Sequence, residues 1–159
     1  MENTQIQIKS LRDFPMEWEA FSSYIASRWT DEEGKALYDD CIFHARNAEY
    51  FLPNWFIAVK DNEVVGCAGL ITNDFISRMD LMPWLCALYV DEMHRKRGIA
   101  GKLISAVKEY AKKNGMKYIY LATDHTAFYE RYGGEMIATG VHPWRETSRI
   151  YRMETGYEY

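Results

Sequence analysis

The residues of this chain that are best placed for chemistry form a short basic turn. The turn follows the apolar segment 84–90 and opens a run with helical spacing. Its members are Arg95, Lys96, Arg97, Gly98, Ile99, Ala100, Gly101 and Lys102. The first backbone N–H groups of a helix have no intrahelical partner, and together with the positive end of the helix dipole they bind anions. Because Gly98 also lets a ligand approach the backbone closely, we expect the turn to bind a diphosphate.

The spacing of apolar residues predicts the strands that must position this turn. Ile6 and Ile8 alternate with polar neighbours, which is typical of a half-buried strand. The segment 84–90 is almost wholly apolar, as expected for a central strand buried on both faces. Further strands are expected at 55–59, 64–71, 118–122, 136–141 and 149–153.

Helical spacing accounts for most of the remaining chain, apart from a polar loop expected at 73–83. Helices are expected from about 14, from 30 to about 50, over 99–114 and over 126–132. Thr30 and Glu33 have the spacing of a capping box for the second helix, and Gly115 ends the third. Strands and helices in this order indicate an α/β or α+β fold with a mixed sheet.

Two segments together resemble the signatures of the GNAT N-acetyltransferase superfamily. The pattern Arg95-x-x-Gly98-x-Ala100 is similar to the family's acetyl-CoA signature, Gln/Arg-x-x-Gly-x-Gly/Ala. The segment from His125 to Gly133 is similar to the second signature, a helix that carries a tyrosine and ends in glycine. The resemblance implies a mixed, mainly antiparallel sheet flanked by helices, with splayed strands at a CoA cleft. It also implies one acetyltransferase domain over residues 1–159 and acetyl-CoA as the donor.

The resemblance implies roles for particular residues in binding CoA. The pyrophosphate is expected at the 95–102 turn, with Arg95 and Lys96 as point charges near the phosphates. The backbones of Leu88 and Val90 are expected to bond the pantetheine arm, because an unpaired strand edge offers N–H and C=O groups to an amide-bearing ligand. His125 occupies a position where the family often has an asparagine that contacts the same arm.

Tyr129 is the side chain that the resemblance marks as the general acid. Acetyl transfer to an amine expels a CoA thiolate, and a phenol can protonate that thiolate. Tyr132, before the glycine, corresponds to a position that commonly packs. The pair Gly133-Gly134 departs from the family's usual Gly-Phe or Gly-Trp, so we expect less packing at this end of the site.

The general base is left open by the sequence. Asp80, Asp124 and His125 flank the expected site, but the segment 84–90 contains no carboxylate, so the family's strand carboxylate does not transfer to this chain. His125 fits a cofactor contact better than a base. Asp80 is kept as the candidate base, although an ordinary loop role also explains it.

The acceptor is expected to be a primary amine of a small molecule or peptide, which attacks the thioester directly. It would enter over the loop 73–83 and the first two helices, opposite acetyl-CoA. Residues to examine for acceptor contact are Trp29, Asn73, Asp74 and Trp144. Because no base is evident, a non-catalytic acyl-CoA-binding sensor or interaction module is the alternative function.

Composition excludes several other classes of protein. The chain has 159 residues and a formal net charge of −4, which argues against a nucleic-acid binder. The cysteines at 41, 67 and 86 lack the spacing of a zinc site or a disulfide framework, so no metal is expected. Residues 1–5 are polar and no apolar run has the length of a membrane span. We therefore expect a cytoplasmic protein without a membrane partner, as a monomer or a homodimer.

Overall fold

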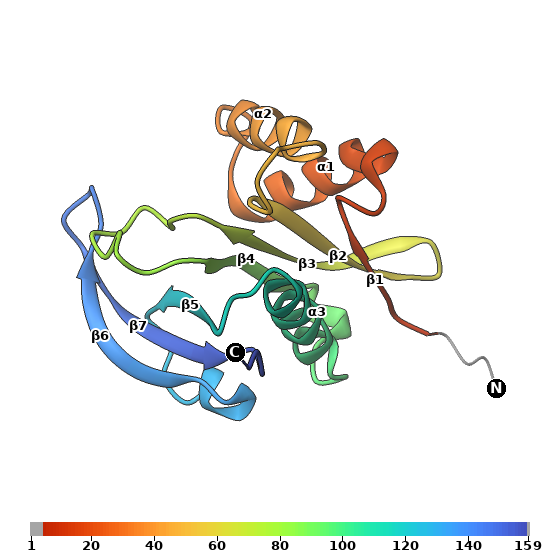
Figure 1. Cartoon of the computed structure of the whole chain (residues 1–159). Coiled ribbons are helices and arrows are strands. Elements are labelled where there is room, and N and C mark those ends of the chain that lie inside the picture. The colour runs from red at the N-terminus through yellow and green to blue at the C-terminus, as the bar shows by residue number, and fades with distance from the viewer. Residues whose placement is uncertain (1–4, 159) are drawn as a thin grey trace.

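The computed structural model describes residues 5–158, which are built on a seven-stranded sheet (Figure 1). The strand order is β1-β2-β3-β4-β5-β7-β6, and every neighbouring pair is antiparallel except β4 and β5. The strands are β1 (Gln7–Ser10), β2 (Asn54–Lys60), β3 (Glu63–Ile71), β4 (Trp84–Val90), β5 (Tyr118–Thr123), β6 (Glu135–Val141) and β7 (Thr147–Glu154). The predicted mixed, mainly antiparallel sheet is confirmed. The polar segment 1–5, noted in the sequence, lies outside the described residues except for its last residue.

Helices cover both faces of the β1–β4 half of the sheet. Figure 1 shows α1 (Trp18–Trp29) and α2 (Lys35–Ala45) on one face and α3 (Ile99–Lys113) on the other. Three single turns of 3-10 helix complete the described secondary structure: η1 (Pro15–Glu17), η2 (Glu92–His94) and η3 (Tyr129–Tyr132). The sheet therefore separates an α1/α2 side from an α3 side, and β4 contacts α1 on one side and α3 on the other.

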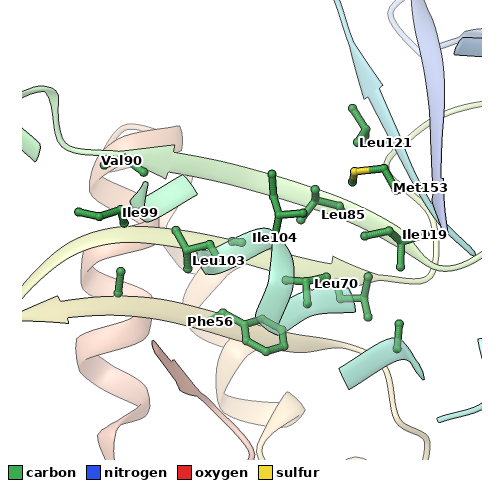
Figure 2. Packing of buried hydrophobic residues seen from close by; sticks show 14 of the residues in the cluster. Phe56, Leu70, Leu85, Val90, Ile99, Leu103, Ile104, Ile119, Leu121 and Met153 are labelled. Atoms are coloured by element: carbon green, nitrogen blue, oxygen red, sulfur yellow. The ribbon is translucent and has the colours of Figure 1, made fainter. Parts of the chain in front are cut away.

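The main core lies between α3 and the sheet (Figure 2). The α3 residues Leu103 and Ile104 are fully buried, as their helical spacing predicts. Figure 2 shows strand residues that pack with them: Phe56, Leu70, Leu85, Val90, Ile119, Leu121 and Met153. This packing fixes the start of α3, at Ile99, against the end of β4.

Two expectations about helices are wrong. Thr30 does not cap a helix at its start; it has an extended backbone and its N–H donates to the carbonyl of Ala26, so that it ends α1. A turn follows, in which the Asp31 carboxylate accepts from Gly34 N–H at 3.0 Å, and α2 runs only from Lys35 to Ala45. The helix expected over 126–132 is also shorter, because only Tyr129–Tyr132 form a helical turn.

Candidate active site

The sheet opens at its single parallel pair of strands. Strands β4 and β5 are paired only through Trp84 and Tyr120, and beyond this point they diverge (Figure 1). A cavity of about 560 Å³ lies beside the far end of β4. Its walls come from the end of β4, from the turn before α3 and from the segment that follows β5. The fold thus brings to one cavity segments that are far apart in the chain, and Trp29 at the end of α1 completes the lining.

Most residues predicted to contact CoA line this cavity. They are Leu88, Val90, Arg95, Lys96, Gly98, Ile99, Ala100, His125 and Tyr129. The three others, Arg97, Gly101 and Lys102, belong to the same turn but are not part of the lining. Gly101 lies beneath Tyr132, where an added Cβ would be 3.1 Å from the ring, so glycine lets Tyr132 pack against α3.

The turn before α3 leaves the start of the helix open. Gly98 is the N-cap residue, with φ at +80°, and it supplies no side-chain hydrogen bond to the first N–H groups of α3. A Cβ added to Gly98 would meet no atom within 4 Å, so there is open space beside the residue that precedes α3. Uncapped donors at a helix start with room before them form an anion site.

Arg95, which we expect to lie near the phosphates as a point charge, also has a structural role. Its Nε donates to the carbonyl of Val90 at 2.9 Å, and its guanidinium lies over the Tyr89 ring, 5.2 Å from the centroid. These contacts fasten the turn to the end of β4. Lys96, whose φ is +64°, lines the cavity and supplies positive charge beside the helix start.

Strand β4 carries a bulge where it reaches the cavity. Cys67 pairs with Tyr89 and Gly69 with Cys86, so the single residue Ala68 faces both Ala87 and Leu88. The extra residue of a bulge leaves the regular ladder and re-aims the backbone around it. The Leu88 side chain is partly buried against the α3 core, and Leu88 also lines the cavity.

Tyr129 lies half-buried in η3, with its side chain on the cavity. Burial, and to a smaller extent the neighbouring Tyr132, raise the pKa of the Tyr129 hydroxyl to about 12. The hydroxyl therefore keeps its proton at neutral pH, as a general acid must. Gly134 follows this turn, and a Cβ there would come within 2.7 Å of the Tyr129 carbonyl oxygen. Glycine at 134 thus lets the Tyr129 turn close, which explains why no aromatic residue stands there.

Comparison with protein families settles what kind of domain this is. The model of the acetyltransferase (GNAT) family matches residues 13–134, which is most of the chain. The chain belongs to the GNAT acetyltransferase family. A search of curated proteins finds no match.

Solved GNAT structures share the fold with this chain at low sequence identity. A putative acetyltransferase of the GNAT family from Desulfovibrio desulfuricans is 15% identical with a TM-score of 0.72, covering 96% of this chain and 100% of its own. An aminoglycoside 6'-N-acetyltransferase complexed with coenzyme A is 17% identical with a TM-score of 0.70, covering 96% and 99%. The ribosomal-protein-S18-alanine N-acetyltransferase from Escherichia coli is 15% identical with a TM-score of 0.65, covering 98% and 97%.

The four residues expected to contact the acceptor lie in two separate regions of this GNAT chain. Trp29, the last residue of α1, lines the cavity together with the CoA-binding segments. The other three lie where the loop 72–83 meets the β6–β7 hairpin. Asn73 is held within the loop, because its side chain donates to the Ile76 carbonyl at 2.9 Å and accepts from the Ile76 N–H at 3.0 Å. Trp144 is exposed and stacks on His142, with ring centroids 4.5 Å apart.

Asp74 and Asp80 differ in their surroundings. Burial raises the pKa of the Asp74 carboxyl, while His142 acts in the opposite direction. Asp80 is exposed and its carboxylate forms a two-point ion pair with Arg78, at 2.9 and 2.8 Å. The hydrogen bonds from Arg78 lower the pKa of Asp80, which weakens it as a base. Because Asp80 also does not line the cavity, we do not carry it into the proposed mechanism.

Sequence reasoning missed a polar network that joins α1 to the end of β4. The Asp91 carboxylate accepts from the Tyr24 hydroxyl at 2.6 Å and from Arg28 Nε at 3.1 Å. Burial alone would raise the pKa of Asp91, but these two hydrogen bonds and the Arg28 charge outweigh it, and the pKa is lowered. The position of Asp91 directly after a buried strand was a usable signal; Tyr24, on the apolar side of a helix, carried none.

His94 is a second residue that the sequence did not single out. It lies in η2 and lines the cavity. Its Nδ1 atom is buried and has no hydrogen-bond partner among residues 5–158. A buried ring nitrogen without a partner is costly, which makes His94 a ready contact for a polar ligand group in this cavity.

We expect Asp91→Asn to lower the free energy of unfolding at pH 7 by about 1–2 kcal/mol, because charge-assisted hydrogen bonds from Tyr24 and Arg28 are weakened. The lowered pKa of Asp91 means that this contribution is present above the ordinary carboxyl value of 3.8 and is lost as the pH falls below it. Urea denaturation at pH 7 and pH 3 measures the difference between the two proteins. A difference that stayed constant across this range would contradict the assignment.

Neither a metal site nor a membrane span is visible in the part of the chain that the structure describes. No group of three or more His, Cys, Asp or Glu side chains is arranged to hold a metal ion within residues 5–158. Over the same residues, none of the helices is both long and apolar enough to cross a bilayer.

Proposed function

We propose that this chain transfers an acetyl group from acetyl-CoA to a primary amine of a small molecule or peptide by direct attack. Acetyl transfer in general follows from membership of the GNAT family. The observation that carries the finer proposal is the cavity itself, where an open helix start, the bulged end of β4 and the protonated Tyr129 face one another.

The residues of the cavity fit CoA as a co-substrate. The N–H groups at the start of α3 and the charge of Lys96 suit the pyrophosphate, and the empty space at Gly98 gives it room. Leu88 and Val90 lie beyond the single pairing of β4 with β5 and line the cavity, and we assign their backbones to the amide groups of pantetheine. His125 lines the same cavity and is assigned to the CoA arm.

The proposed reaction has two steps. The amine nitrogen attacks the thioester carbonyl carbon, a C–N bond forms, and the carbonyl oxygen becomes an oxyanion that a backbone N–H of β4 stabilises. The intermediate then collapses, the C–S bond breaks, and Tyr129 donates its proton to the departing thiolate. The proton lost by the amine leaves to solvent, because we assign no protein group as the base, and Tyr129 takes a proton back from solvent before the next turnover.

The acceptor side of the proposal rests on the end of α1 and on the region where the loop 72–83 meets the β6–β7 hairpin. Trp29, Asn73, Asp74 and Trp144 remain the proposed acceptor contacts. Two structural neighbours are named for amine acceptors, one for an aminoglycoside and one for the alanine of a ribosomal protein. We place the activity in one domain spanning residues 1–159, cytoplasmic and monomeric or homodimeric. The net charge of −4 supports the expectation that no nucleic acid is bound.

A non-catalytic acyl-CoA sensor is the second candidate function, and one observation favours it. The described residues that line the cavity include no Asp or Glu, so no carboxylate there can deprotonate an amine. A sensor would bind acetyl-CoA by the same contacts and would not turn it over.

Thiol release in the presence of amines distinguishes the two candidates. The protein is mixed with acetyl-CoA and with representatives of five acceptor classes: polyamine, amino acid, aminosugar, aminoglycoside and peptide. Release of free CoA thiol with one class, together with an acetylated product seen by mass spectrometry, supports the enzyme. Saturable acetyl-CoA binding with no thiol release for any class favours the sensor.

A further inference from the structure

The peptide unit between Ala87 and Leu88 is held out of the regular ladder of β4. Ala87 has a φ of +52°, which is uncommon for a residue with a Cβ. It belongs to the bulge in which Ala87 and Leu88 together face Ala68. A backbone turned in this way persists only when its surroundings hold it.

Two side chains hold the carbonyl of this peptide. The indole Nε1–H of Trp29 donates to the Ala87 oxygen at 3.1 Å, and the Cys67 thiol donates to the same oxygen at 3.2 Å. Cys67 is fully buried in β3, whereas Trp29 lies at the end of α1 and is 46% exposed. The Trp29 ring also meets the Tyr89 ring edge-on, with centroids 6.5 Å apart.

The direction of this carbonyl determines the direction of the next N–H. The Ala87–Leu88 peptide is trans, so its C=O and N–H point in opposite directions. Because the Ala87 oxygen is directed at Trp29 and Cys67, the Leu88 N–H is directed away from them. Leu88 lines the cavity, so its N–H, on the side of the peptide away from Trp29 and Cys67, is the donor that we assign to a thioester bound there.

We propose that Trp29 is a positioning residue, whose indole N–H holds the Ala87–Leu88 peptide so that the Leu88 N–H polarises the thioester carbonyl. This inference rests on the proposed function, since it needs acetyl-CoA in the cavity. Trp29 touches the peptide through one polar atom on an exposed ring. The Nε of the adjacent Arg28 donates a hydrogen bond to the Asp91 carboxylate at 3.1 Å. This contact holds the end of α1 beside β4 and thereby positions the Trp29 backbone.

The test is infrared spectroscopy of bound acetyl-CoA labelled with ¹³C at the thioester carbonyl. It needs no acceptor amine. In the native protein the carbonyl band is expected at lower wavenumber than in free acetyl-CoA, because a hydrogen bond weakens the C=O bond. Trp29→Phe keeps an aromatic ring and removes the N–H, so the band is expected to move back toward its free position, with the Kd for acetyl-CoA unchanged. With an acceptor, kcat should fall about tenfold and the KM for acetyl-CoA should not change.

Trp18→Phe is the matched control. Trp18 begins the same helix, outside the cavity lining, and meets Phe43 edge-on at 5.1 Å. This variant should show the native band, and equal thermal midpoints for both variants establish that both are folded.

The outcomes separate the two proposals. A shifted band in the native protein that is unchanged in Trp29→Phe overturns the role of Trp29 and leaves the proposed function standing. An unshifted band in the native protein also overturns the role of Trp29, because no hydrogen bond then reaches the thioester carbonyl. Failure of the native protein to bind acetyl-CoA overturns the proposed function and this inference together.

Discussion

Tyr129→Phe is expected to lower kcat about a hundredfold and to leave the Kd for acetyl-CoA within about twofold, because only the proton donor is removed. The ring stays in place against Phe128 and Tyr151, whose centroids lie 4.8 and 6.2 Å away. Steady-state thiol release gives kcat, and calorimetric titration gives Kd. A loss confined to affinity would contradict the acid role.

The control for this variant is Tyr132→Phe, three residues along the same turn. Tyr132 also borders the cavity, but its ring packs on Gly101 and the resemblance assigns it to packing, so most activity should remain. Equal losses of kcat in the two variants would show that the Tyr129 hydroxyl is not the general acid.

The pKa of Tyr129 adds a pH dependence to the same prediction. The active form of Tyr129 is protonated, and burial raises its pKa to about 12 from the ordinary 10.0. Activity should therefore not fall through loss of this proton between pH 7 and about pH 10. A fall in kcat centred on pH 10 that disappears in Tyr129→Phe would contradict the raised pKa.

Gly98→Val is expected to weaken acetyl-CoA binding by at least about tenfold. A β-branched residue is strained at a φ of +80°, and its side chain would fill the open space beside the residue that precedes α3. Both effects act on the proposed pyrophosphate site. Calorimetric titration with acetyl-CoA measures the change in Kd.

Gly115→Val separates loss of the site from loss of stability. Gly115 follows the other end of α3 and has nearly the same φ, +81°, so valine is strained there as well. Both variants should lose similar free energy of unfolding in urea, yet only Gly98→Val should lose affinity. Equal loss of affinity in both would mean that general destabilisation, and not the site, explains the effect.

The parts of the fold with a clear period or a terminating glycine were predictable. Strand β4 was expected at 84–90 and is found there. A short, almost wholly apolar run is typical of a central strand, which is why this element was predictable. Helix α3 was expected over 99–114 and runs over Ile99–Lys113, since Gly98 and Gly115 bound it. Thr30 was misassigned because a residue that caps a helix start and one that ends the previous helix look alike in sequence.

The candidate site was predictable where its residues lie close together in sequence and not where the fold assembles it. The basic turn and the Tyr129 segment could be named from the two signatures, and the structure places both on one cavity. The bulge at Ala87 has no signal in an apolar run, and its contact with Trp29 joins residues 58 positions apart. The network of Tyr24 and Asp91 is hidden for the same reason, since it depends on how α1 lies against β4.

The measurement that tests the central claim most directly is calorimetric titration of the protein with acetyl-CoA, with ATP as the control ligand. The account predicts saturable one-to-one binding of acetyl-CoA and none of ATP, because the cavity provides for the pantetheine arm as well as the pyrophosphate. Absence of acetyl-CoA binding would contradict the assignment of residues 95–102 and the transferase with it. Equal binding of ATP would show that the turn recognises phosphate alone.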